Sequence, residues 1–276
     1  MREGIPTQEI TPIEEQEGVE YIPQLEQHGL DGELFLSIWE KNKGDEHSFY
    51  ERNMEMIDEM EKEEPGSVSF LNKKYGVFNF SRYPIEILLD QYRSHGDTGT
   101  PYGIVLYPLE DNHGAFSKKE DELIFRDIYN QMDGQFKIKI LESSGKRDIL
   151  KKLVNLKNFF NKEGNGHKIS FAIIGGHGDK SSIKFGSRDS SDGVFNIEDL
   201  EDQSIINIRE SIFEPHPTFV LNSCETGIES GMADRLKSKF NAEVFAPKEK
   251  TIIEDIDVVI ENGAIRFDVQ YVDNFS

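Results

Sequence analysis

Cysteine is nearly missing from this 276-residue chain, which contains one, Cys224. A single cysteine cannot form a disulfide within the chain or supply a multi-cysteine zinc site, and it is typical of proteins in a reducing compartment. Long apolar stretches are missing as well. No run approaches the ~18 residues that cross a membrane, and the first residues lack the apolar segment of a signal peptide. We therefore expect a cytoplasmic protein without a membrane partner.

Basic residues are scarce relative to acidic ones. The chain has 31 Lys and Arg against 52 Asp and Glu, which gives a formal net charge of -21. Nucleic-acid backbones and anionic membranes repel such a protein, so we expect no nucleic-acid partner. Basic substrates or divalent cations are better suited to this negative field.

The acidic excess is strongest at the start of the chain. Residues 1–64 carry 19 acidic and five basic side chains. We interpret them as an acidic N-terminal extension, partly helical or disordered, with a helical subdomain packed on the core as the alternative. The extension would be a pro-segment or the docking site of a regulatory partner, or else a passive solubilising tail. Residues 65–99 are predicted to connect it to the rest, with a hairpin within 67–82 and a short helix over 85–92.

Strand-like and helix-like patterns alternate regularly from residue 100 to residue 276. Apolar runs predict strands at 102–107, 136–141, 169–174, 218–223, 243–247 and 263–269. Helical spacing predicts helices within 117–132, 149–160, 197–213 and 228–240. This alternation indicates an α/β domain with a mainly parallel sheet and helices on both faces. Ligands of such sheets bind beyond the carboxyl ends of the strands.

Two of the predicted strands end in residues that can carry chemistry. One runs into Gly-Gly-His-Gly-Asp, with His177 at the centre, and another runs into Asn-Ser-Cys-Glu-Thr-Gly, with Cys224. Both would lie at the same rim of the sheet. A helix is expected to begin at Cys224, and a helix N-terminus lowers the pKa of a thiol. Taken singly, each residue is more often structural, but together they suggest a nucleophile and its base.

The order of these residues along the chain narrows the choice. All seven histidines precede Cys224, which excludes the order found in papain-type enzymes. His177 lies 47 residues before Cys224. A caspase-type arrangement places its histidine ~50 residues upstream of the cysteine.

The motifs resemble a known family at this point. His177-Gly178, and Ser223-Cys224 with Gly227, are similar to the His-Gly and Cys motifs of the caspase-like peptidases, which include caspases, metacaspases, legumain, clostripain, gingipains and separase. The resemblance also covers the order of elements over residues 100–276. It implies a caspase-like three-layer sandwich and a cysteine endopeptidase without metal or cofactor. Caspases are commonly cut in a long linker after the cysteine strand, but only Glu225 to Asn241 separate Cys224 from the next predicted strand here, so we expect the domain to work as one chain.

The same resemblance implies the site. Cys224 would be the nucleophile, His177 its catalytic partner, and the backbone N–H groups of Gly178 and Cys224 the oxyanion hole. The substrate would be a peptide or protein. Candidates for binding the substrate lie at three places. Asn222 is close to the cysteine, the loop after the first predicted strand contains Glu110, Asp111 and His113, and the loop after the fifth contains Lys248, Glu249 and Lys250. The carboxylates favour cleavage after a basic residue, with Asp or Asn next.

Three other interpretations are open from the residues alone. Gly175 to Ser181 nearly matches a phosphate-binding loop, but Asp179 would repel a phosphate there. His177 and Asp179 could bind a metal, but no second histidine follows at the spacing that a helix would need. A non-catalytic caspase-like scaffolding or binding module is the third and strongest rival.

Overall fold

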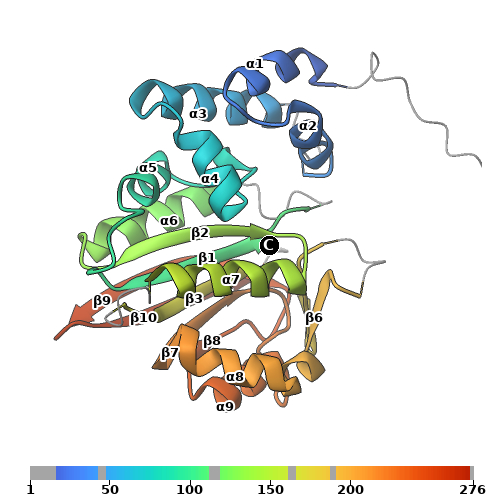
Figure 1. The fold of residues 1–276 in the computed structure, drawn as a ribbon. Helices are drawn as coiled ribbons and strands as arrows, with labels where there is room; N and C mark the ends of the chain where they lie inside the picture. The colour runs from blue at the N-terminus through green and yellow to red at the C-terminus, as the bar shows by residue number, and fades with distance from the viewer. Residues whose placement is uncertain (1–16, 43–47, 112–118, 161–165, 187–190, 274–276) are drawn as a thin grey trace, which may run out of the picture.

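A parallel five-stranded sheet forms the centre of the molecule. The computed structural model describes residues 17–42, 48–111, 119–160, 166–186 and 191–273 (Figure 1). The strands are ordered β2-β1-β3-β7-β8. Their bounds are β1 Tyr102–Pro108, β2 Lys137–Ser143, β3 Ile169–Gly175, β7 Phe213–Asn222 and β8 Glu243–Phe245. All four neighbouring pairs are parallel, so the strand ends that carry chemistry share one rim.

Helices cover both faces of this sheet. Helices α7 (Lys146–Phe160), α8 (Gln203–Ile212) and α9 (Met232–Phe240) lie on one face, and α5 (Ile85–Arg93) and α6 (Lys119–Met132) lie on the other (Figure 1). Successive side chains of β1 point to opposite faces of the sheet. Leu106 faces α7, while the ring of Tyr107 packs on Phe125 of α6. The predicted α/β architecture with a parallel sheet is confirmed.

Two small antiparallel sheets accompany the central one. β4 (His177–Asp179), β5 (Ser182–Lys184) and β6 (Val194–Asn196) follow β3 directly. β9 (Thr251–Glu261) and β10 (Ala264–Asp273) form a long hairpin, turned by Asn262 and Gly263 at positive φ. The predicted last strand therefore pairs with β9, which the sequence interpretation missed, and it does not join the central sheet.

The described part of the N-terminal region consists of packed helices. They are α1 (Ile22–Gln27), α2 (Gly32–Glu40), α3 (Phe49–Glu63) and α4 (Ser67–Tyr75), which lie above the sheet in Figure 1. Four aromatic side chains of these helices are buried against one another: Phe35, Trp39, Phe49 and Tyr50. They belong to the same hydrophobic core as the α/β part. For residues 17–42 and 48–64 this matches the helical alternative. No helix of the described residues is long and apolar enough to cross a membrane.

The hairpin predicted within residues 67–82 is wrong. α4 occupies Ser67–Tyr75, and a single 3-10 turn follows at Phe80–Arg82. Gly66 and Gly76, both at positive φ, flank this helix. Its buried residues Val68, Leu71 and Tyr75 have the spacing of one helix face, not the alternation of a strand.

Candidate active site

The ends of β3 and β7 leave the sheet side by side. Gly175 pairs with Asn222 in the parallel register, and the Gly176 N–H donates to the Asn222 carbonyl at 3.3 Å. The Ser223 hydroxyl donates to the Gly176 carbonyl at 2.7 Å. These bonds tie together the two segments that continue into His177 and Cys224, which therefore lie at the same rim, as the sequence predicts.

Gly178 makes the approach of the two segments possible. A Cβ atom at this position would stand 2.7 Å from the Cys224 carbonyl oxygen and 2.9 Å from Ser223 Cβ. Such distances are too short for any side chain, so glycine is required where the His177 strand lies against the Cys224 backbone.

His177 is held by a buried carboxylate. Its Nε2 lies 3.1 Å from Oδ1 of Asp111, which follows β1 in the chain and is fully buried, while the His177 side chain is 34% exposed. An ionised carboxylate can only accept, so Nε2 carries the hydrogen and Nδ1 is the ring nitrogen that can take a proton. The Arg82 guanidinium, buried nearby, attracts the negative charge of Asp111.

This geometry corrects the predicted role of Asp111. Because its carboxylate is buried and bonded to His177, it lies behind the imidazole and cannot form the wall of a substrate pocket. No third member of the site stood out in the sequence. The one available signal was position, since Asp111 follows β1 at the rim where β3 and β7 also end.

Two more predicted substrate contacts are engaged elsewhere. Glu110 forms an ion pair with Lys41 at the end of α2, at 2.8 Å. Asn222 is buried, and its side-chain amide donates to the Tyr107 hydroxyl at 2.9 Å. Both side chains are therefore bonded to other parts of the fold, which differs from the predicted substrate contacts. His113 lies outside the described residues.

The loop between β8 and β9 runs beside the cysteine. Lys248, Glu249 and Lys250 are exposed, and the Glu249 carbonyl accepts a bond from the Glu225 N–H at 3.0 Å. Lys250 is close enough for its charge to influence the Cys224 thiol. Lys250 and the Glu249 backbone therefore lie beside the segment that carries Cys224, while the predicted contact of this loop with a substrate stays a prediction.

Cys224 has a different environment from the one predicted. Burial raises the pKa of its thiol, and the Glu225 carboxylate adds to the rise, while the residue's own N–H and Lys250 oppose it. Its Sγ lies 3.9 Å from the Thr251 carbonyl oxygen. The predicted helix N-terminus is absent here, because turns follow Cys224 and α9 begins only at Met232.

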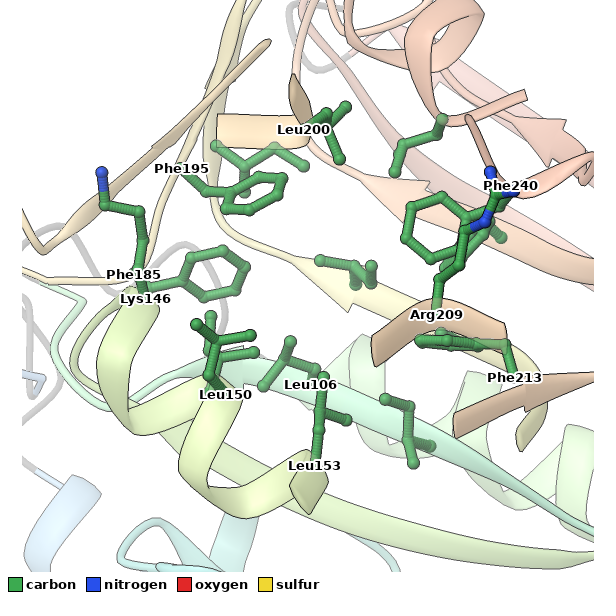
Figure 2. Close-up of a pocket in the computed structure, with 17 residues that line it drawn as sticks. Leu106, Lys146, Leu150, Leu153, Phe185, Phe195, Leu200, Arg209, Phe213 and Phe240 are labelled. Atoms are coloured by element: carbon green, nitrogen blue, oxygen red, sulfur yellow. The ribbon is translucent and has the colours of Figure 1, made fainter. Parts of the chain in front are cut away.

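A mainly apolar pocket lies elsewhere in the fold. It has a volume of about 100 Å³ and lies between the sheet and helices α7, α8 and α9, with Lys146 and Arg209 as the charged residues of its lining. Figure 2 shows side chains from several elements around it, among them Leu106, Leu153, Phe213 and Phe240. Neither His177 nor Cys224 lines this space. It is therefore separate from the candidate site.

Within the described residues, no group of three or more His, Cys, Asp or Glu side chains is arranged to hold a metal ion. Comparison of the chain with protein-family models, with curated proteins and with solved structures finds no match.

Proposed function

We propose that this protein is a cysteine endopeptidase in which Cys224 is the nucleophile, His177 the proton carrier and Asp111 the residue that orients His177. The observation that carries the proposal is the bond from His177 to the buried Asp111, on a strand that packs directly against the Cys224 backbone. A nucleophile, a base and a carboxylate that orients the base are the parts that acyl transfer requires. The resemblance to caspase-like motifs supports the same assignment.

The reaction divides into two steps. The Cys224 thiol gives its proton to His177, and Sγ attacks the carbonyl carbon of the substrate. When the C–N bond breaks, His177 returns the proton to the leaving amine and a thioester remains on Cys224. Water then loses a proton to His177 and attacks the thioester, the C–S bond breaks, and the thiol is regenerated.

Asp111 supports this cycle electrostatically. The imidazole becomes positively charged once it has taken the thiol proton, and the buried carboxylate on its far side stabilises that charge. The backbone N–H groups of Gly178 and Cys224 are the proposed donors to the oxyanion. Glu110 and Asp111 are bonded to other residues of the fold. The charges that are left beside Cys224 have both signs, because Glu225 and Glu249 are acidic and Lys250 is basic, so they do not by themselves favour a basic residue before the cut.

The test is hydrolysis of a fluorogenic peptide library that varies the residue before the cut. We expect Cys224→Ala and His177→Ala each to lower kcat/KM by about 10³-fold or more. His216→Ala is the matched control, because His216 is exposed near the start of β7 and bonds to Asn241. Full activity of Cys224→Ala would overturn the proposal.

A non-catalytic binding module is the second candidate, and the raised thiol pKa favours it. Burial keeps Cys224 protonated near neutral pH, which is the state of an inert buried cysteine. A peptide chloromethyl ketone decides between the two. A peptidase is alkylated at the chain's one cysteine, and prior loss of His177 slows the labelling. A binding module reacts slowly, and at the same rate with and without His177.

A further inference from the structure

The loop that carries Asp111 is fastened by a residue from the N-terminal helices. Asn42, two residues beyond the end of α2, is fully buried. Its side-chain N–H groups donate to the carbonyls of Ile38 and Leu109, each at 2.7 Å, and its Oδ1 accepts from the Asp111 N–H at 2.8 Å. One side chain thus joins the last turn of α2 to both sides of Glu110.

Asparagine is suited to this position by its chemistry. A primary amide has two N–H donors and a carbonyl acceptor, so it can bond two carbonyls and one N–H at once. The Ile38 carbonyl, in the last turn of α2, also accepts from the Lys41 N–H at 3.1 Å, and Asn42 adds a second donor to it. The neighbouring ion pair of Lys41 with Glu110 adds a second link between the same two segments.

We infer that Asn42 is a positioning residue for the Asp111–His177 pair, and that the N-terminal helices are part of the catalytic unit. This inference depends on the proposed function. The bond to the Asp111 N–H fixes the backbone of the residue whose carboxylate holds His177 Nε2. The connection runs from α2 through Asn42 and Asp111 to the imidazole, entirely through hydrogen bonds.

The inference contradicts a removable pro-segment. Cutting the chain between α2 and the sheet and losing the N-terminal piece would remove Asn42 and expose the carbonyl and N–H groups that it bonds. An active form of this protein would therefore retain α2. The test is made in the full chain, because the two parts share one core.

The experiment compares Asn42→Ala and Asn42→Asp with a matched control, Gln91→Ala. Gln91 is equally buried, and its amide joins α5 to the backbone N–H and carbonyl of Ile140 in β2, which are not part of the site. We expect both Asn42 variants to lower kcat about 10- to 100-fold with little change in KM, because small displacements of catalytic groups have effects of this size. Gln91→Ala should lose stability but keep its kcat.

A second readout does not require turnover. The hydrogen on His177 Nε2 should give an NMR signal protected from water by its bond to Asp111, and this signal should broaden or disappear in Asn42→Ala and Asn42→Asp. If either folded variant keeps kcat and the protected signal, the inference fails while the peptidase proposal stands. If His177→Ala leaves peptide cleavage intact, the proposed function itself fails. Should Asn42→Ala not fold, Asn42→Asp carries the test, because it fills the same volume but loses the donors to the Ile38 and Leu109 carbonyls, and the Leu109 bond also holds the loop of Asp111.

Discussion

The two halves of the candidate site are held in different ways. His177 is fixed by side chains: a buried carboxylate holds its ring, and a buried amide holds the residue that supplies the carboxylate. Cys224 is fixed by hydrogen bonds to backbone carbonyls in the turns around it, where the Gly227 N–H donates to the Pro247 carbonyl at 2.7 Å and the Thr226 hydroxyl donates to the Ser223 carbonyl at 2.7 Å. The Cys224 Sγ lies 3.9 Å from the Thr251 carbonyl oxygen.

The difference indicates where each half derives its reactivity. The histidine half is preorganised by buried charge, so its function should respond strongly to substitutions that leave the backbone intact. The cysteine half has a raised thiol pKa and is surrounded by exposed charges, so it should respond weakly and in proportion to each charge. Substitutions in the two halves can test this contrast.

The largest expected effect is on the histidine half. Asp111→Asn preserves shape but removes the charge and offers an N–H where His177 Nε2 also presents one. We expect kcat/KM to fall by about 10²- to 10⁴-fold, as removal of an orienting carboxylate does in other triads. Glu110→Gln is the neighbouring control, since it weakens the ion pair with Lys41 but leaves the Asn42 bonds and the Asp111 carboxylate in place, so activity should fall far less. Similar activity in both variants would argue against a triad.

The second prediction concerns the buried charges beneath this half. Glu142 in β2 accepts bonds from Arg82, from the Tyr83 hydroxyl and from the N–H groups of Phe78 and Asn79. Arg82 also donates to the Pro108 carbonyl at the end of β1. Glu142→Ala leaves the guanidinium without its counter-charge in the interior. We expect the free energy of unfolding to fall by about 3–5 kcal/mol, measured by urea denaturation.

The matched control for this loss is an arginine on the surface. Arg93 pairs with Glu64 at 2.7 Å, but its side chain is 52% exposed. Arg93→Ala should lower the free energy of unfolding far less than Glu142→Ala does, because water screens an exposed pair. Equal losses in Arg93→Ala and Glu142→Ala would show that the buried network contributes no special stability.

The sequence predicted correctly that the segments of His177 and Cys224 lie at one rim of the sheet, but it did not predict which neighbouring side chains are buried there. Apolar runs ending in His177 and Cys224 were sufficient, since parallel strands bring their carboxyl ends together. Burial was not visible in the sequence, so Asp111 and Asn222 were assigned to a pocket although both are inside the fold. Their partners, His177 and Tyr107, are more than 60 residues away along the chain.

Local backbone geometry explains the other errors. A helix was expected to begin at Cys224, but it begins only at Met232. Glu225 and Ser230 adopt positive φ before it, and neither glutamate nor serine is a residue type that predicts this conformation. The link from Asn42 to Asp111 was equally hidden, because it joins two regions that were read as separate domains. In contrast, β9 could have been found, since Ile256 and Val258 alternate with charged or exposed residues.

The third prediction tests the backbone of the cysteine half. Glu225 has φ 60, a left-handed conformation that is costly for residues with a Cβ atom. Glu225→Gly should therefore raise the free energy of unfolding by up to about 1 kcal/mol, less the entropy that glycine adds to the unfolded chain. Glu225→Ala keeps a Cβ and removes the same charge, so it should give no such gain. A gain in both variants would point to charge rather than backbone strain.

The smallest expected effects are those of single charges on the thiol. Alkylation of Cys224 by iodoacetamide requires the thiolate, so its rate should rise with pH and be half-maximal above the ordinary cysteine pKa, because burial raises the pKa of Cys224. Glu225→Gln removes a charge that raises this pKa, and Lys250→Gln removes one that lowers it. The rates are compared at about pH 7.5, roughly one unit below the reference cysteine pKa. There Glu225→Gln should react about two- to threefold faster than the parent protein, and Lys250→Gln about two- to threefold slower. Both differences should shrink in about 0.5 M salt, because exposed charges are screened. Changes in the same direction would mean that the two loops move with substitution and that the cysteine half is less firmly held than its backbone bonds indicate.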